Sequence, residues 1–374
     1  MKKSILLLAV LAVSLIGIGT ANAIDGYSSQ ERISVTVETD PLGSPPWIKA
    51  KWELWVDPNT DDEFILTDAD PVRLGTQGDI VPGDGATFYS FVIVSDPNGI
   101  EDISNGNVYV DVYHPTCGYG DGSFKYQVHA KEIELVRDQL GIPDLSAPVF
   151  NGYSVEDLLQ LGVAAGYFTS AEADELWEEL HQNEARIYAA ELFIDYHQAY
   201  GWYMVKAWAT DNNGATSEKF TNYFEVRPML AYETDFDSVH FTNVKVGYRA
   251  QVSGDYDMNT SDRPTIRNIG NTPIAVSAYA SDATSSTDPP KKFENVFDMR
   301  FLDEDLMLPS WEWTRFSNLL WPCNTTKIDF SLHLPNGAPA TEYTGYILLE
   351  YQAVIVPCKP MDPVSDPVQV LPPT

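Results

Sequence analysis

Residues 48–56 read Ile-Lys-Ala-Lys-Trp-Glu-Leu-Trp-Val, and this stretch decides the fold class. Its apolar side chains fall at alternate positions, namely Ile48, Ala50, Trp52, Leu54 and Val56. Successive side chains of a strand point to opposite faces, so this period of two predicts a β-strand with a buried face. Trp55 breaks the alternation, so either Trp52 or Trp55 must lie off the first buried face.

The same period of two recurs along most of the chain. Further alternating runs lie at 33–37, 108–112, 124–130, 203–209, 244–246, 274–278, 328–334 and 346–355. Asp, Asn, Gly and Pro punctuate these runs at 57–59, 96–99 and 211–214, as in tight turns. Many short strands separated by such turns predict a mainly β protein built as a β-sandwich.

One block between the strand patterns is predicted to be helical, roughly residues 131–199. Thr169 and Glu172 have the spacing of a capping box, and Ser154 is a candidate cap for a preceding helix. From Ala171 to Tyr200 there is no Gly or Pro. The apolar residues there recur at near-helical spacing, at Leu176, Leu180, Ile187, Ala190 and Ile194. We expect a helical insertion in a sandwich loop, serving either as a contact surface or as a lid over an open sheet face.

Two segments resemble immunoglobulin-like domains of secreted proteins. Residues 94–100 (Val-Ser-Asp-Pro-Asn-Gly-Ile) are similar to a mid-strand turn of such domains, and residues 203–214 are similar to their penultimate strand and hairpin. The resemblance covers about 120 residues and implies a spacer or binding module of a surface protein.

The second half resembles secreted archaeal β-sandwich proteins. Residues 263–274 are similar to a strand-turn-strand segment, and residues 334–339 with 343–346 are similar to a closing hairpin. Together with an export signal, this resemblance implies an archaeal cell-surface or sheath-like protein.

Four segments follow from these patterns. Residues 1–23 are a predicted signal peptide, with Lys2 and Lys3 before an apolar core and Ala-Asn-Ala at 21–23 for cleavage; an uncleaved anchor is the alternative. Residues 24–228 are one immunoglobulin-like sandwich with the helical insertion. Residues 229–357 are a second such sandwich, and 358–374 are a proline-rich tail that is either frayed or laid along a neighbouring sheet edge. We expect no membrane-spanning segment in the mature chain.

Charge bears on partners and location. Removing the signal peptide removes two lysines, which leaves 54 acidic against 21 basic residues and a net charge of about −33. This charge repels nucleic acid, which is therefore not an expected partner. It favours divalent cations, or it simply keeps an extracellular protein soluble.

The three cysteines and two glycosylation motifs fit an exported protein. We pair Cys323 with Cys358, which leaves Cys117 as a buried thiol or an intermolecular link. Asn259 and Asn324 each begin an Asn-x-Ser/Thr sequence and are candidate N-glycosylation sites.

Calcium is the one cofactor that the residues suggest. Asp57, Asn59 and Asp61 place oxygen ligands at alternate positions, with Asp68 able to help, as in the first half of a calcium loop. An EF-hand is excluded because the sixth position is Asp62 rather than Gly. Asp255 and Asp257 form a second candidate. The alternative for both loops is that the carboxylates accept hydrogen bonds from their own turn.

No catalytic motif appears: the chain has no HExxH, GxSxG or P-loop sequence. We therefore expect no enzyme, with a secreted hydrolase as a remote alternative. Tryptophans cluster at 47–55 and at 311–321, either in the core or on a surface that binds sugar or protein.

The function that these features favour is a structural component of a surface layer, sheath or filament that associates with itself or with other envelope proteins. The alternative is an adhesin that binds carbohydrate or protein.

Overall fold

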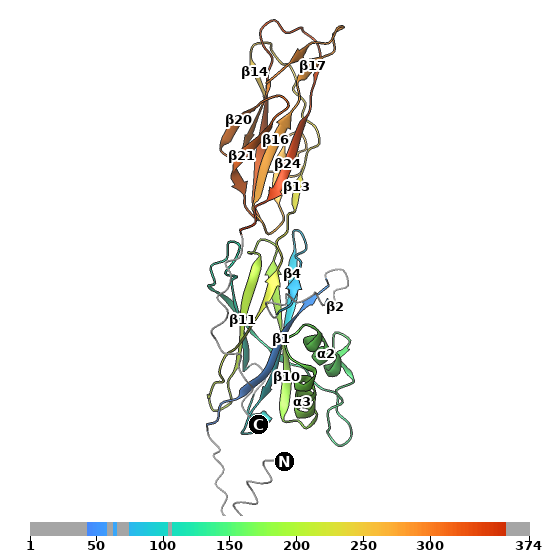
Figure 1. Cartoon of the computed structure of the whole chain (residues 1–374), viewed down its shortest axis with the longest axis vertical. Helices are drawn as coiled ribbons and strands as arrows, with labels where there is room; N and C mark the ends of the chain where they lie inside the picture. Colours follow the sequence, from blue (N-terminus) through green and yellow to red (C-terminus); the bar gives the residue numbers. More distant parts are fainter. Residues whose placement is uncertain (1–42, 58–62, 66–74, 104–106, 357–374) are drawn as a thin grey trace, which may run out of the picture. The chain divides into compact units, whose positions relative to one another are not determined.

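The computed structural model describes residues 43–57, 63–65, 75–103 and 107–356 (Figure 1). Over these residues the protein is mainly β, as predicted. Its strands form two sets, and each set pairs only within itself. We name β1–β12 the first sandwich and β13–β24 the second. The segments 1–23 and 358–374 lie outside the described residues, and the predicted division at residue 228 stays a prediction.

The first sandwich has two five-stranded sheets. One has the order β2-β1-β4-β10-β7, with bounds Phe64–Ile65, Trp47–Val56, Gly85–Ser95, Ala185–Asp195 and Lys131–Glu132. The other has the order β3-β12-β11-β5-β6, with bounds Gln77–Gly78, Phe220–Val226, Gly201–Ala209, Val108–Tyr113 and Phe124–His129. Between the sheets the ring of Phe88 stacks on that of Phe224 at 4.2 Å. The predicted strand at 48–56 is β1, next to one edge of its sheet.

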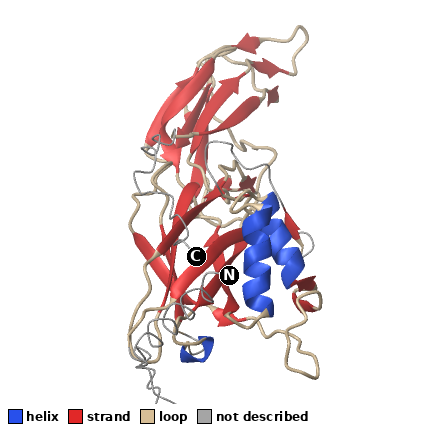
Figure 2. Cartoon of the chain, turned by 60° about the horizontal axis from the view of Figure 1, so that its bottom comes forward, coloured by secondary structure: helices blue, strands red, loops and turns tan. Residues whose placement is uncertain are grey.

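Two α-helices cover the outer face of the β1-containing sheet. They are α2 (Val155–Ala164) and α3 (Ser170–His181), and they follow a short hairpin of β8 (Pro148–Phe150) and β9 (Tyr153–Ser154). Figure 2 shows the two helices side by side against the strands of the β1-containing sheet. Apolar side chains of both helices pack on Trp52 and its neighbours in one buried cluster. The helices therefore act as a lid over the sheet, one of the two roles foreseen for them.

The predicted helix caps are present. The hydroxyl of Ser154 accepts the backbone N–H of Asp157 at 3.1 Å, and the hydroxyl of Thr169 accepts that of Glu172 at 3.3 Å. Both caps form complete capping boxes, which explains why each helix begins where the sequence indicated. Neither helix in the described part of the chain is long and apolar enough to span a bilayer.

The helical prediction is wrong beyond His181. Residues 185–195 form β10, which pairs with β4 at all eleven positions. Ile187 lies under the helices, whereas Ala190 and Ile194 lie between the sheets. The strand is thus apolar on both faces, and a continuous apolar run imitates helical spacing. The helices occupy a narrower part of the chain than the predicted 131–199.

An ion pair is enclosed in the first sandwich. Lys51 and Glu53 of β1 have no exposed side-chain surface, and the Lys51 ammonium donates to Glu53 and to the amide oxygen of Asn222 on β12. Ser90 of β4 donates to the Glu53 carboxylate at 2.9 Å. Burial raises the pKa of the Glu53 carboxyl and lowers the pKa of the Lys51 ammonium, and the attraction between the two opposes both shifts.

The second sandwich is built from short sheets. The largest has the path β13-β15-β22-β19-β20 with β14 also on β22, and bounds Tyr232–Thr234, Thr265–Asn268, Thr325–His333, Phe297–Phe301, Glu304–Leu308 and Arg249–Val252. A three-stranded sheet has the order β21-β16-β24, with bounds Trp313–Leu320, Ile274–Ala280 and Ile347–Ala353. A small sheet has the order β18-β17-β23, with bounds Lys292–Phe293, Ala283–Ser285 and Tyr343–Thr344. A separate apolar cluster, which includes Phe301, Phe316 and Phe330, fills this sandwich.

Removing one partner of the buried ion pair is expected to destabilise the protein strongly. Glu53→Ala leaves the Lys51 charge buried without its carboxylate, so the free energy of unfolding should fall by about 3–5 kcal/mol. Urea unfolding of the mature chain measures this loss. The control is the double variant Lys51→Met, Glu53→Leu, which buries no charge and should lie nearer to the wild type. If the single and the double variant lost the same free energy of unfolding, the unpaired buried charge of Lys51 would not be the cause of the loss.

Candidate functional site

The first predicted calcium loop is only partly within the described residues. Asp57 is described and its backbone N–H donates to the carbonyl of Glu63 at 2.7 Å, which closes the turn after β1. Asn59, Asp61 and Asp68 lie outside the described residues. A calcium site in this loop therefore stays a prediction.

The second predicted calcium loop holds its carboxylates with its own hydrogen bonds. Asp255 accepts from the backbone N–H of Asp257 at 2.8 Å and from the hydroxyl of Thr260 at 2.8 Å. Asp257 accepts from the backbone and amide N–H groups of Asn259 at 3.0 and 2.8 Å. The N–H of Asp257 contributes most to lowering the pKa of the Asp255 carboxyl. This arrangement matches the turn alternative, in which the loop stabilises its own acids.

The two predicted glycosylation sites are accessible. Asn259 and Asn324 are both exposed and lie in turns rather than inside strands. Accessibility is what glycan attachment requires, and the presence of glycans stays a prediction.

The cysteines differ from the expected pairing. Cys323 is a free, exposed thiol that accepts a hydrogen bond from the hydroxyl of Tyr196 at 3.4 Å. Cys117 is buried and disulfide-bonded, and Cys358 lies outside the described residues. The backbone N–H of Val356 donates to the Tyr200 hydroxyl at 2.7 Å, close to Cys117, whose sulfur accepts from Trp202. The last described residue, Val356, therefore lies near Cys117. The positions of the cysteines in the sequence cannot reveal this proximity.

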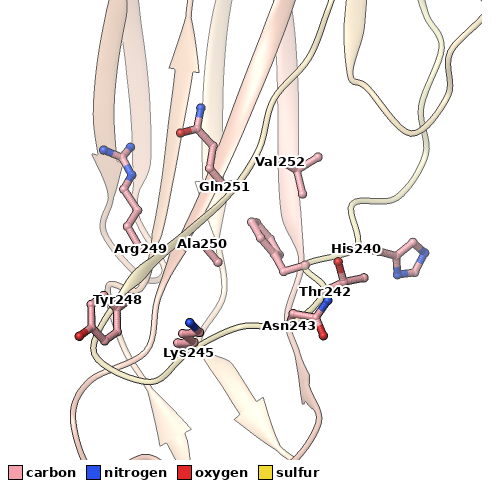
Figure 3. Close-up of a pocket in the computed structure, with 10 residues that line it drawn as sticks. His240, Thr242, Asn243, Lys245, Tyr248, Arg249, Ala250, Gln251 and Val252 are labelled. Atoms are coloured by element: carbon pink, nitrogen blue, oxygen red, sulfur yellow. The ribbon is translucent and has the colours of Figure 1, made fainter.

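One hollow on the described surface is formed by a loop and the strand that follows it. It has a volume of about 430 Å³ and is lined by His240–Asn243, Lys245 and Tyr248–Val252 (Figure 3). Figure 3 shows that the His240 and Arg249 side chains point away from each other. Arg249 is moreover paired with Asp305 at 3.1 Å and Asp298 at 3.4 Å. The hollow thus lacks the converging polar groups typical of an active site.

A cluster of aromatic rings gathers on the second sandwich, and we name it the aromatic patch: Tyr279, Trp311, Trp313 and Tyr346. The ring of Tyr279 lies 5.3 Å from that of Trp313 and 6.2 Å from that of Trp311. Trp311 in turn lies 6.2 Å from Tyr346. About half the surface of Trp311, Trp313 and Tyr346 is exposed. The patch is therefore one continuous surface of rings, not scattered apolar residues.

The strand register places the aromatic patch on the outer face of the β21-β16-β24 sheet. Trp313, Tyr279 and Leu348 stand directly opposite one another across the three strands. The next row on the same face is polar, with Arg315, Ser277 and Glu350. An apolar row thus lies beside a hydrogen-bonding row on an open sheet face.

Trp311 is held in a backbone conformation that bulky residues rarely adopt. Its φ is 67°, in the left-handed region, which costs roughly 1–2 kcal/mol for a residue with a side chain. Two hydrogen bonds hold it there: its N–H donates to the Ala280 carbonyl at 2.8 Å, and its indole N–H donates to the buried carboxylate of Asp282 at 3.0 Å. The fold therefore fixes this ring at the surface against a local energetic cost.

Comparisons with known proteins found only distant structural similarities. No protein-family model and no curated protein matches the chain. A structure of the chaperone–tip adhesin complex of CFA/I fimbriae is similar at 8% identity with a TM-score of 0.27, covering 82% of this chain and 85% of that chain. The C-terminal domain of the Streptococcus pyogenes antigen I/II-family protein AspA is similar at 12% identity with a TM-score of 0.21, covering 82% and 99%. Similarities this distant carry no argument about this chain.

The cysteine geometry predicts the outcome of disulfide mapping. Cys323 is free and Cys117 is bonded, so in a chain with three cysteines we expect a Cys117–Cys358 bridge. Non-reducing peptide mapping of mature monomer, alkylated before digestion, should find Cys323 alkylated and the other two cysteines joined. Cys323→Ser serves as the control and should leave the bridge intact. A Cys323–Cys358 peptide would contradict the expectation.

Proposed function

We propose that the protein is exported and acts at the cell surface as a binding protein of the adhesin kind, with the aromatic patch as its contact surface. The observation that carries the proposal is Trp311, a bulky residue kept at φ 67° and half exposed within a cluster of rings. Costly backbone conformations persist where the surrounding structure enforces them, and they concentrate at functional sites.

The proposed occupant of the aromatic patch is a carbohydrate. A sugar ring presents apolar C–H faces and a rim of hydroxyls, and it can lie on aromatic rings while it bonds polar neighbours. The row of Trp313, Tyr279 and Leu348 offers the apolar platform, and the adjacent row with Arg315 and Glu350 offers donors and acceptors. The aromatic patch is an open, half-exposed face, so an extended glycan chain can lie along it.

The charge of the chain narrows the class of carbohydrate. The mature protein carries 54 acids against 21 bases, so polyanionic glycans are repelled. A neutral polysaccharide avoids that repulsion. The proposed ligand is therefore a neutral glycan chain.

Self-assembly into a surface layer, sheath or filament is the second proposal. The observation that favours it is the strand β20, which lies at the end of the largest sheet of the second sandwich and carries the exposed Met307. An open edge strand can add a strand from another chain. The archaeal source and the absence of enzymatic activity stay predictions.

Replacing one ring of the patch should weaken carbohydrate binding. Trp313→Ala removes one stacking contact, and we expect about tenfold weaker binding, about 1.4 kcal/mol, because an aromatic contact contributes on this scale. Affinity electrophoresis through gels that contain soluble glucan, mannan or galactan measures the binding. The matched control is Trp321→Ala, since Trp321 has nearly the same exposure, 48% against 52%, and lies outside the aromatic patch.

Three outcomes separate the proposals. Retardation of the wild type that is lost in Trp313→Ala but kept in Trp321→Ala supports carbohydrate binding. Unchanged mobility of the wild type in all three gels contradicts it for these neutral glycans. Concentration-dependent polymers in light scattering that survive Trp313→Ala would favour self-assembly through strand edges.

A further inference from the structure

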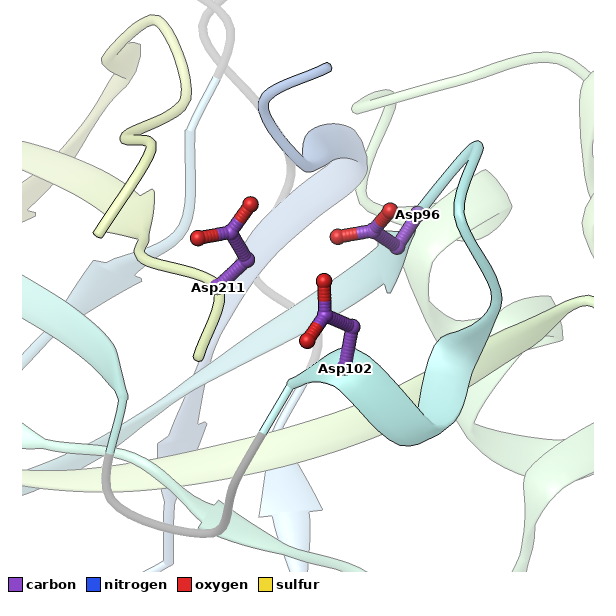
Figure 4. Close-up of side chains that lie close together, drawn as sticks. All are labelled: Asp96, Asp102 and Asp211. Atoms are coloured by element: carbon purple, nitrogen blue, oxygen red, sulfur yellow. The ribbon is translucent and has the colours of Figure 1, made fainter. Parts of the chain in front are cut away.

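Three carboxylates from separate loops converge at one end of the first sandwich. Asp96 follows β4 in the turn 96–99, Asp102 ends the short 3-10 helix η1 (Ile100–Asp102), and Asp211 follows β11 in the turn 211–214. Each offers a carboxylate oxygen, and these oxygens lie within 4.8 Å of one another. Figure 4 shows the three side chains facing a common space.

The two buried acids of this group each leave one oxygen without a partner. Asp96 is 8% exposed and Asp211 is 2% exposed. Their Oδ1 atoms accept backbone N–H groups, from Asn98 at 2.7 Å for Asp96 and from Ala215 at 2.7 Å for Asp211. Their Oδ2 atoms are buried and have no hydrogen-bond partner within the part of the chain that the structure describes. Buried polar atoms are nearly always satisfied, so two orphaned oxygens in one cluster indicate a missing partner of positive charge.

No basic side chain of the described residues supplies that charge. The nearby Arg186 pairs with Glu101 at 2.7 Å and Glu132 at 3.1 Å instead. The Asp102 side chain accepts a hydrogen bond from the side-chain amide of Asn213 at 3.0 Å. Burial raises the pKa of the Asp96 carboxyl, and the Asp102 and Asp211 carboxylates raise it further against the lowering effect of the Asn98 N–H.

We propose that Asp96, Asp102 and Asp211 bind one calcium ion that joins the loops of the two facing sheets. The donors are all oxygens, which suits a hard divalent cation. Two ligands of one ion lie at most two metal–oxygen bonds apart, about 5 Å for calcium and about 4.2 Å for magnesium. The three carboxylate oxygens all lie within 4.8 Å of one another, which satisfies the limit for calcium. This site is in the first sandwich and does not depend on the carbohydrate proposal for the second.

We expect calcium to raise the melting temperature of the wild type. We also expect the order of the wild type and one site variant in melting temperature to reverse when calcium is added. Asp211→Asn keeps the shape of the side chain but removes one of the three repelling charges. In EDTA the variant should therefore melt at the same temperature as the wild type or higher. In calcium the wild type alone should gain stability, so the order reverses. Binding of calcium to the variant should be at least tenfold weaker.

The test uses the mature chain after removal of metal, with thermal melting and calorimetric titration in EDTA, calcium and magnesium. The first control, Glu175→Gln, removes an equal charge from an exposed position of α3 and should respond to calcium like the wild type. The second, Asp255→Asn, removes an acid of the self-bonded loop and should do the same. A wild type without a calcium shift, or an equal shift in Asp211→Asn, would overturn the site. A shift lost in Asp255→Asn but kept in Asp211→Asn would place the ion in the other loop.

Discussion

The first sandwich depends on β1 being buried on both faces. One face carries Trp52 and neighbouring apolar residues, which α2 and α3 cover. The other face carries Lys51 and Glu53, enclosed between the sheets with partners on β4 and β12. A buried pair is tolerated only when each charge has its partner in place, so three strands must meet in one register. Asn222 strengthens this constraint, because its side-chain amide also donates to the backbone carbonyl of Lys51 at 2.8 Å. Asn222 on β12 therefore bonds both the side chain and the backbone of Lys51 on β1.

Two pairs of tryptophans, one in each sandwich, have opposite roles. Trp52 and Trp55 are 0% and 5% exposed and fill the two cores on either side of β1. Trp311 and Trp313 stay about half exposed on a sheet whose outer face no helix of the described residues covers. The first sandwich buries Trp52 and Trp55 for stability, whereas the second presents Trp311 and Trp313 at its surface. This contrast is why the contact surface is assigned to the second sandwich and the helices to a covering role.

The sequence could predict those parts of the fold that local rules decide. The alternation at 48–56 and the caps at Ser154 and Thr169 are local, and the structure has all three. Strand β10 was missed because both of its faces are apolar, and only its pairing with β4 distinguishes it from a helix. The same limit applies to Cys117, since its nearness to the end of the second sandwich is set by tertiary structure.

The calcium candidates illustrate the limit most sharply. Sequence reasoning favours acids that are dense in one loop, such as Asp255 and Asp257, yet dense loops can satisfy their own carboxylates, as this one does. Asp96 and Asp211 stand far apart in the sequence and each looks like an ordinary turn residue. What distinguishes them is the pair of buried oxygens that their own turns leave without a partner. Glu53 is also a buried acid and also leaves its Oε2 without a hydrogen-bond partner among the described residues, but Lys51 balances its charge. The group of Asp96 and Asp211 has no such basic partner there, and this is why we propose that it takes a cation from outside.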